Sequence, residues 1–283
     1  MNKTKKNFSY CKPSKKKEVI SCYSKKSLLK MTKAWNNKYN DTLSDNLNED
    51  QLWGNLNKKL SNKCNSEWCW NKLDFIKELN DTEINTAFRP QMPDEWKSNP
   101  NAWLSTIDID NVMYQYMTKF SNFYFLGTHP MDFAEKNSDN TCKVSELCKF
   151  SLSDFVNEGL NKLGLVLNLD KSHQSGSHWV CIFIDIDSNN IYYWDSYGVE
   201  PEKEVYDFVN TIKTQGKALN KKFNFHINTY RHQFKNSECG VYCLWFLIKL
   251  LESNNSLKEY NRIVIKKVKD EIMEKNRKVL FIS

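Results

Sequence analysis

Runs of apolar residues in the second half of the chain predict a sheet followed by a buried helix. Trp179–Asp185 is almost continuously apolar and rich in β-branched and aromatic residues, as expected of a strand buried on both faces. Residues 191–195 follow a turn-forming segment and predict the returning strand of a hairpin. Residues 223–231 alternate as a third strand, and the apolar run that begins at Cys239 predicts a buried helix.

The rest of the chain shows mainly helical spacing of its apolar residues. It predicts helices over 18–35, 50–60, 67–79, 151–162, 201–219 and 258–278, and further strands over 123–126 and 165–169. Another helix through about Phe120 is capped by Ser105 or Asp108. Gly164 is a plausible stop for the helix over 151–162. This mixture predicts an α+β fold with a mixed central sheet flanked by helices. A Pro-rich joint over 89–100 predicts a boundary between an N-terminal helical arm, residues 1–95, and a core domain, residues 96–283.

The basic charge is concentrated at the start of the chain. The net charge is +7, but residues 1–40 carry +11 and the remainder carries −4. The arm is therefore expected to be either a solvated tail or a non-specific contact for nucleic acid or an acidic partner. No apolar run approaches the roughly 18–20 residues needed to span a bilayer, and no apolar segment follows the first lysines. We therefore expect a soluble protein without a secretory signal; oligomeric state is left open.

The nine cysteines do not suggest a disulfide framework or a metal site. Their number is odd, the chain is long, and no Cys-x-x-Cys is present. Cys64 and Cys69, like Cys142 and Cys148, have no nearby histidine at the spacing of zinc ligands. We expect reduced cysteines that mostly fill the core, and no metal or organic cofactor.

Cys239 differs from the other cysteines in its position at the start of the buried helix. A polar turn delivers Cys239-Gly240 directly to that helix. Unpaired N–H groups and the partial positive charge at a helix N-terminus stabilise a thiolate. Taken alone, a cysteine that opens a helix is more often a packing residue. The hypothesis that Cys239 is a nucleophile therefore needs partners elsewhere in the chain.

Three polar residues supply those partners. His178 precedes the central strand and Asp195 closes its partner strand, so a hairpin would place the two side chains next to each other. Such an imidazole, oriented by a carboxylate, can act as the general base for a thiol. Gln233 lies six residues before Cys239 and, with the Cys239 backbone N–H, could stabilise an oxyanion. Each residue alone has an ordinary structural explanation, but the joint order predicts catalysis by His178, Asp195, Gln233 and Cys239.

These motifs resemble the adenovirus protease and SUMO-specific protease superfamily of cysteine peptidases. The resembling pieces are His178-Trp179, Asp195-Ser196, Gln233, Cys239-Gly240 and, ahead of them, Trp103-Leu104 with Asp108. A closer similarity, to the polyprotein-processing proteases of African swine fever virus and related large DNA viruses, rests on 175–185, 231–240 and, more weakly, 130–133 and 64–69. The resemblance is strong over about 160–250 and implies the peptidase fold for residues 96–283.

The resemblance implies a cysteine endopeptidase that cuts after Gly-Gly, with a slot walled by Trp179 and, with weaker support, Trp103. The substrates would be viral structural or core polyproteins carrying Gly-Gly-Xaa sites, processed during virion maturation in the host cytoplasm, at the viral factory, and in the virion. An alternative is the removal of ubiquitin or SUMO-like modifiers from host proteins, which uses the same catalytic residues. A third reading, an acetyltransferase or an inactive binding module on the same fold, is disfavoured by the intact Gln233 and His178-Trp179.

Overall fold

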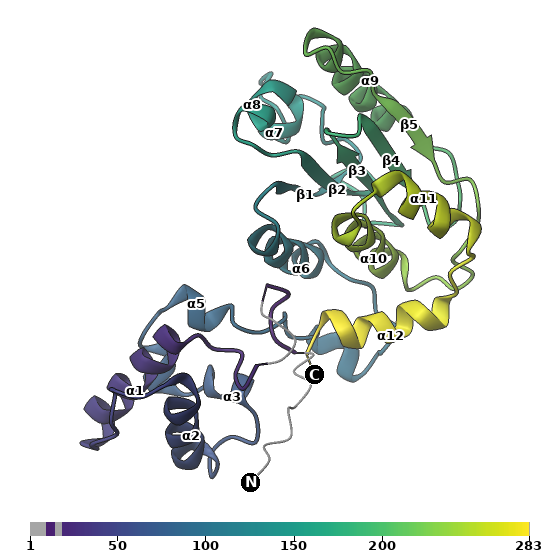
Figure 1. The fold of residues 1–283 in the computed structure, drawn as a ribbon. Coiled ribbons are helices and arrows are strands. Elements are labelled where there is room, and N and C mark those ends of the chain that lie inside the picture. Colours follow the sequence, from purple (N-terminus) through teal and green to yellow (C-terminus); the bar gives the residue numbers. More distant parts are fainter. Residues whose placement is uncertain (1–9, 15–18, 283) are drawn as a thin grey trace. The chain divides into compact units, whose positions relative to one another are not determined.

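The computed structural model describes residues 10–14 and 19–282, which form two compact units. One unit comprises the chain up to Gln91 together with Ile282, and the other runs from Met92 to Phe281. Figure 1 gives the order of their elements along the chain. The units divide within the Pro-rich joint, four residues before the boundary expected from the sequence. Each unit is described by itself below.

The first unit is a small helical domain with its own core. Its helices are α1 (Lys25–Tyr39), α2 (Glu49–Leu60), α3 (Glu67–Trp70), α4 (Asp74–Lys77) and α5 (Thr82–Asn85). One apolar face of α1 and one of α2 are buried, as their spacing predicts. The single helix expected over 67–79 is wrong. The chain turns at 71–73, so that Trp70 and Phe75 both reach the same core.

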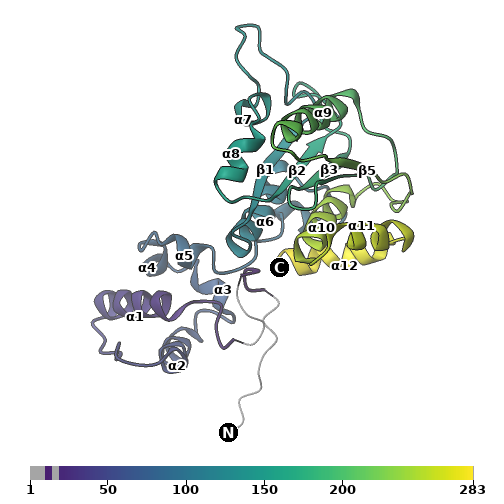
Figure 2. The same cartoon turned by 45° about the horizontal axis from the view of Figure 1, so that its top comes forward.

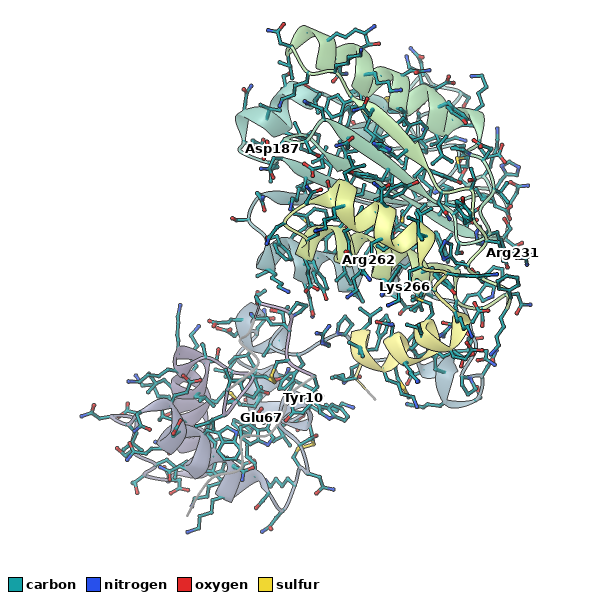
Figure 3. The ribbon with its side chains drawn as sticks, turned by 45° about the vertical axis from the view of Figure 1, so that its right-hand side comes forward. Tyr10, Glu67, Asp187, Arg231, Arg262 and Lys266 are labelled. Carbon is teal, nitrogen blue, oxygen red and sulfur yellow. A yellow bond between two sulfur atoms is a disulfide. The ribbon has the colours of Figure 1, made fainter. Side chains whose placement is uncertain are left out.

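Glu67 ties distant parts of this first unit together. Its carboxylate accepts hydrogen bonds from the Ser21 hydroxyl at 2.5 Å, the Cys22 amide at 3.2 Å and the Trp53 indole at 2.7 Å. Glu67 and Tyr10 are labelled in Figure 3. A buried carboxylate needs such partners, because an unpaired buried charge would be strongly destabilising. The 64–69 segment that carried part of the resemblance therefore has a structural role in this unit.

The expectation of reduced cysteines is wrong for six of the nine. Disulfides join Cys11–Cys22, Cys64–Cys69 and Cys142–Cys148. Each pair is separated by 11 residues or fewer, and the Cα atoms lie 5.1–5.8 Å apart, within the range that a disulfide spans. Cys181, Cys239 and Cys243 remain as free thiols.

The second unit is built on a five-stranded mixed sheet. The strands are β1 (Phe123–Pro130), β2 (Lys162–Asn168), β3 (Trp179–Asp185), β4 (Asn190–Trp194) and β5 (Asn224–Ile227), and their order in the sheet is the order in the chain. β1 pairs with β2 and β4 with β5 in parallel, whereas β2–β3 and β3–β4 are antiparallel. This confirms the predicted α+β fold with a mixed sheet.

Alternate residues of the strands enter two separate cores. Phe183 and Trp194 pack with helices α6 (Thr106–Lys119) and α10 (Cys239–Glu252) on one face of the sheet. Ile182 and Tyr193 pack on the other face, with α8 (Leu152–Asn157) and α9 (Lys203–Ala218). Figures 1 and 2 show the sheet between these two helical layers. β3 is buried along its whole length, as its apolar run predicts.

The remaining helices of this unit are short or lie at its C-terminal end. They are the 3₁₀ helix η1 (Asp94–Lys97), α7 (Ser145–Cys148), α11 (Ser256–Ile265) and α12 (Asp270–Leu280). The single helix expected over 258–278 is wrong, because non-helical backbone at 266–269 separates α11 from α12.

Two other sequence-based boundaries need correction. The helix expected over 151–162 ends after Asn157, and Gly159, whose φ is +76°, is the left-handed residue beyond it. Gly164 lies instead within β2. The third strand expected over 223–231 is limited to β5, so the chain between Ile227 and Cys239 is irregular.

The N-terminal arm is described only in part. Lysines at positions 3, 5, 6 and 15–17, half of those that make residues 1–40 basic, lie outside the described residues. The helix expected over 18–35 starts later, at Lys25, and ends at Tyr39. In the part of the chain that the structure describes, no helix combines the length and the apolar character needed to cross a bilayer.

Candidate active site

The β3–β4 hairpin brings His178 and Asp195 together. His178 immediately precedes β3 and Asp195 immediately follows β4, and the antiparallel register pairs Cys181 with Trp194. Nε2 of His178 hydrogen-bonds to Oδ1 of Asp195 at 2.6 Å. Both side chains are buried, with exposed fractions of 6% and 1%. Nδ1 of the imidazole therefore remains available for another partner.

A tight turn after β4 orients the Asp195 carboxylate. Oδ1 also accepts the amide N–H of Tyr197 at 2.8 Å, and Oδ2 accepts that of Val199 at 3.3 Å. Gly198 adopts a φ of +73° in this turn, and a Cβ there would lie 2.6 Å from the carbonyl carbon of Tyr230. The Tyr197 ring stacks on the His178 imidazole, with centroids 4.4 Å apart. Sequence reasoning missed Tyr197, whose only signal was its place beside Asp195-Ser196.

The electrostatic environment favours the protonated form of His178. Burial lowers the pKa of the imidazole, but hydrogen bonds to Asp195 and Cys239 more than offset this and raise it to about 9. At neutral pH the site therefore supports an imidazolium between a carboxylate and a sulfur atom. A protonated imidazole in this position can stabilise a negatively charged sulfur and can return its proton to a leaving group.

Cys239 is the first residue of α10. It is 1% exposed, and its side chain lies close enough to His178 to help raise the pKa of the imidazole. The helix continues as an almost wholly buried apolar segment. Because it begins at Cys239, the unpaired N–H groups of its first turn lie near the Cys239 sulfur. Cys181 and Cys243 are buried core thiols, as expected, and burial raises the pKa of Cys243 well above its ordinary value.

Gln233 lies in the irregular segment before Cys239 rather than at the end of a strand. Its side chain is fully buried. Its Oε1 accepts the Ser196 hydroxyl at 2.6 Å, and its Nε2 donates to the carbonyl of Lys235 at 2.7 Å. These two bonds fix which end of the amide carries the N–H groups and leave one N–H uncommitted. Ser196, which the sequence offered only as part of the Asp195-Ser196 motif, orients the Gln233 amide.

Trp179 and Leu104 form a wall against the first turn of α10. The Trp179 indole N–H donates to the carbonyl of Leu104 at 3.0 Å, which fixes the ring beside the base. A Cβ on Gly240 would lie 3.2 Å from the Cβ of Leu104 and 3.3 Å from Cδ1 of Trp179. Glycine at 240 thus allows α10, which begins at Cys239, to approach this wall closely.

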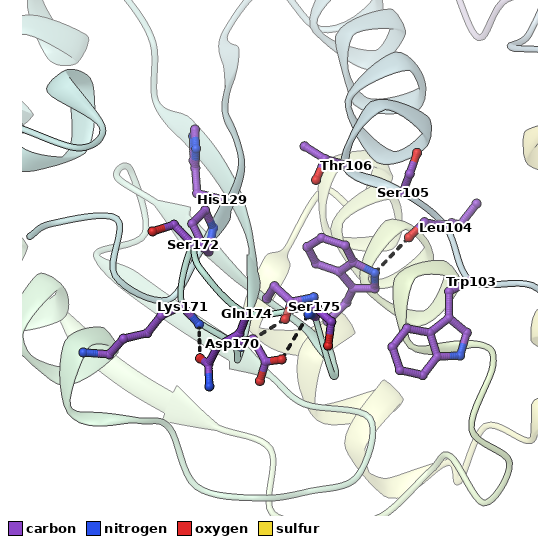
Figure 4. A pocket seen from close by; sticks show the side chains of 14 residues that line it. Trp103, Leu104, Ser105, Thr106, His129, Asp170, Lys171, Ser172, Gln174 and Ser175 are labelled. Atoms are coloured by element: carbon purple, nitrogen blue, oxygen red, sulfur yellow. Dashed lines mark hydrogen bonds between the residues drawn. The ribbon is translucent and has the colours of Figure 1, made fainter.

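A cavity of about 510 Å³ extends from this wall. Trp103 and Trp179, the two tryptophans expected to contact substrate, both line it, together with residues 170–172 and 174–176 (Figure 4). Trp103 is 42% exposed, whereas Trp179 is 7% exposed. The structure therefore places the two rings at one cavity but in different roles, Trp179 as a buried wall and Trp103 as an exposed rim.

Asp132 anchors the loop that forms the far side of this cavity. Its carboxylate, fully buried, accepts the amide of Ser172 at 2.9 Å and its hydroxyl at 2.7 Å, and forms an ion pair with Lys143. Burial opposes ionisation, but these partners hold the pKa of Asp132 below its usual range. The 130–133 segment was singled out by resemblance only, and its contact with Ser172 gives it a physical role.

The site contains the parts that acyl transfer to a thiol requires. Cys239 offers a thiol that can attack a carbonyl, His178 an imidazole that can exchange a proton with it, Asp195 a carboxylate that orients the imidazole, and Gln233 an N–H that can bind an oxyanion. Fold and site together define a cysteine peptidase.

Comparison with known proteins places this peptidase in a family. The family model described as Vaccinia virus I7 processing peptidase matches residues 56–222, and that of the Ulp1 protease family, C-terminal catalytic domain, matches residues 165–281. Both matches include His178 and Asp195, and the second also includes Cys239. The chain belongs to the Vaccinia virus I7 processing peptidase family of cysteine proteases, which is related to the Ulp1 proteases.

Similar individual proteins come from large DNA viruses. A thiol protease of Acanthamoeba polyphaga mimivirus is 30% identical over 261 residues, which cover 83% of this chain and 82% of that protein. The SUMO-1 cysteine protease of African swine fever virus is 28% identical over 254 residues, covering 82% and 88%. A crystal structure of the African swine fever virus protease matches 96% of this chain and 95% of its own, with a TM-score of 0.65 and 23% identity. That last match supports the fold.

Proposed function

We propose that this protease cleaves viral polyproteins after Gly-Gly during virion maturation. The observation that carries the proposal is the close packing of Trp179 and Leu104 against Gly240, next to the nucleophile. Substrate residues that approach Cys239 along this wall meet an immobilised indole ring. Glycine, which has no side chain, is the residue that such a passage accepts most easily.

The proposed reaction uses side chains and one backbone N–H of the chain, together with a water molecule. The Cys239 thiolate attacks the carbonyl carbon after the second glycine, forming a C–S bond. The free N–H of Gln233 and the Cys239 amide N–H stabilise the oxyanion. His178 donates its proton to the leaving amine as the C–N bond breaks. The neutral imidazole then takes a proton from a water molecule, whose oxygen attacks the thioester carbonyl. The C–S bond breaks, the carboxyl product leaves, and the thiolate and the imidazolium are restored.

Peptides that differ by single methyl groups test the glycine preference. Against a Gly-Gly-Xaa peptide, replacing either glycine before the scissile bond by alanine should lower kcat/KM about 10²-fold, because the methyl group would displace the wall. Trp179→Ala should reduce the difference in kcat/KM between the glycine and alanine peptides. Trp103→Ala should reduce it less, because Trp103 is at the exposed rim. Cys239→Ala should abolish cleavage. If the wild type cleaved the alanine peptides as efficiently as the Gly-Gly-Xaa peptide, the proposed glycine preference would be refuted.

A second candidate is the removal of a ubiquitin-like modifier. It is favoured by the name of the African swine fever virus relative, a SUMO-1 cysteine protease, and by the match to the Ulp1 catalytic domain. Suicide probes made from ubiquitin and SUMO separate the two functions. Labelling of Cys239 by a probe would support the modifier reading. Cleavage of Gly-Gly-Xaa peptides without labelling would support polyprotein processing.

We further propose that the enzyme acts in the cytoplasmic viral factory and in the virion, where polyprotein substrates assemble. Mass spectrometry of purified virions and of fractionated infected cells would test this. Presence of the protease only in other fractions would refute it.

Non-specific nucleic-acid contact by residues 1–40 remains part of the proposal. Because α1 buries Leu28 and Met31, the suitable variant removes residues 1–9 only, which carry three lysines. It should bind DNA more weakly and with a shallower salt dependence than the full chain. Unchanged binding and an unchanged slope would exclude these residues as the contact.

A further inference from the structure

Helix α12 holds both ends of the segment that connects Gln233 to Cys239. At one end, Oδ2 of Asp270 accepts the amide N–H groups of Phe234 at 2.9 Å and Lys235 at 3.0 Å. Asp270 is 5% exposed, and its Oδ1 accepts the Tyr242 hydroxyl at 3.2 Å. Because the carbonyl of Lys235 receives Nε2 of Gln233, Asp270 fixes the turn that orients the proposed oxyanion donor.

At the other end, Arg277 holds the residues just before the nucleophile. Its Nε donates to both carboxylate oxygens of Glu238, at 2.9 and 2.7 Å, and its Nη2 donates to the carbonyl of Ser237 at 2.8 Å. Both members of this ion pair are buried, with Glu238 at 0% and Arg277 at 5% exposure. Glu238 is the residue directly before Cys239, so the ion pair is one peptide bond from the nucleophile.

Arg277 also reaches the segment that leads to the wall of the cavity. Its Nη1 donates to the carbonyl of Ala102 at 2.8 Å, and its guanidinium lies 4.3 Å from the centre of the Trp96 ring. Ala102 precedes Trp103 and Leu104, the rim and wall residues of the cavity. One guanidinium therefore connects the nucleophile's segment and the wall's segment to the same helix.

Asp270 and Arg277 are spaced so that one rigid helix can hold both ends of the segment. Asp270 and Arg277 are seven residues apart, which places them on one face of α12 about two turns from each other. A helix keeps such a separation nearly constant, whereas the irregular loop alone would not. We propose that α12 is a positioning element for catalysis: Asp270 positions Gln233 for the oxyanion, and Arg277 positions Cys239 together with the Trp103–Leu104 wall. This rests on the cysteine protease activity and not on the Gly-Gly preference.

The two anchors make different predictions. Asp270→Ala should lower kcat about 10- to 100-fold with little change in KM, because a misplaced oxyanion donor acts on the transition state. Its rate of Cys239 alkylation by iodoacetamide should match the wild type within about twofold, because alkylation forms no oxyanion. Asp270→Asn keeps an acceptor for the two amides and should recover most of the lost kcat.

The Arg277 end is tested with a variant that leaves no lone buried charge. Glu238→Gln combined with Arg277→Met removes the ion pair as a unit. It should lower kcat, slow Cys239 alkylation several-fold and raise KM, because neither Cys239 nor the Trp103–Leu104 wall would be held in place. Arg277→Lys keeps the charge but lacks the planar fork, and should lie between this double variant and the wild type in all three quantities.

Two control variants on the same helix separate positioning from folding. Lys275 is exposed, and Lys275→Ala should leave kcat, KM and alkylation unchanged. Met273 is fully buried between the two anchors, and Met273→Ala should lower Tm while kcat below the transition stays within about twofold of the wild type. The proposal is wrong, and α12 has only a structural role, under either of two outcomes. In the first, kcat decreases in proportion to Tm across all the α12 variants, including Met273→Ala. In the second, Asp270→Ala retains full kcat. Because alkylation needs no substrate, its outcome is independent of whether the chosen peptide is the natural one.

Discussion

His178 and His232 are both buried near the site, yet their environments drive their protonation in opposite directions. The pKa of His178 is raised to about 9 although burial opposes this, because the Asp195 carboxylate bonds to the ring and the Cys239 side chain adds to the effect. Burial lowers the pKa of His232 to about 4, and the Lys267 charge adds to the effect. The Nδ1 of His232 accepts the amide N–H of Val268 at 3.1 Å, a bond that only the neutral ring can accept.

The difference teaches that burial alone does not activate a histidine. His178 has a carboxylate partner, which favours the protonated ring. His232 is held neutral, and its ring lies against Trp194 with the centroids 4.7 Å apart, where it supports the backbone beside Gln233. In the proposed mechanism, His178 transfers protons and His232 supports the backbone that holds the oxyanion donor.

Asp195→Asn should produce the largest effect, because it removes the charge that distinguishes the two histidines. We expect kcat to fall about 10²- to 10⁴-fold, since an uncharged amide neither stabilises the imidazolium nor enforces the productive orientation. Initial rates with a cleaved peptide measure this. Circular dichroism should show an intact fold, since the Tyr197 amide can still bond to the Asn oxygen. A rate within threefold of the wild type would mean that Asp195 does not act on His178.

Gln233→Ala should have the next largest effect, on the His232 side of the site. Loss of one oxyanion donor is expected to lower kcat about 10²- to 10³-fold with KM nearly unchanged. The same assay checks this, and Cys239 should still react with iodoacetamide at the wild-type rate. A raised KM with normal kcat would instead place Gln233 in ground-state binding.

The pH dependence of stability should show both histidines, with opposite signs. The folded-state pKa of His178 is above the usual 6.5, so its stabilisation is complete below pH 6.5 and is lost as the pH rises to about 9. The folded-state pKa of His232 is below 6.5, so its contribution is complete above pH 6.5 and is lost as the pH falls to about 4. Each pKa difference corresponds to about 3 kcal/mol at most.

Urea unfolding at a series of pH values from 4 to 9 measures how the free energy of unfolding changes with pH, on the acid side for His232 and on the alkaline side for His178. His232→Asn, whose amide oxygen can still accept the Val268 amide, should flatten the acid side and leave the alkaline side unchanged. Asp195→Asn should flatten the alkaline side. An acid slope that survives in His232→Asn would assign that slope to other groups.

Ser196→Ala should produce the smallest effect. It removes the hydroxyl that holds Oε1 of Gln233 but leaves the Lys235 carbonyl as a partner for the amide. We expect kcat to fall about three- to tenfold, as for the loss of one neutral hydrogen bond. A decrease as large as that of Gln233→Ala would mean that Ser196 alone determines the amide orientation.

The sequence was informative where structure depends on near neighbours in the chain. The apolar runs of β3 and α10 were predicted at their observed starts, and the short connection between β3 and β4 was enough to place His178 beside Asp195. The class of the protein followed from motifs carried by these same elements.

Features that depend on contacts distant in sequence were not predicted. Arg277 reaches Glu238 across 39 residues and Ala102 across 175, and no local pattern indicates such partners. The helix expected over 258–278 gave no sign of its break, because the apolar spacing continues on both sides. The disulfides were missed because an odd cysteine count was treated as evidence against any pairing, whereas six of the nine pair locally.

The close approach of Gly240 to Leu104 and Trp179 bears on resistance to inhibitors. Leu104 contacts the nucleophile's helix through its side chain and holds Trp179 through its carbonyl. A substitution that reshaped this space, so that a flat or glycine-like inhibitor bound less tightly, would also move Cys239. A virus that carries this enzyme would therefore have few substitutions at this wall that escape such a compound without losing catalytic rate.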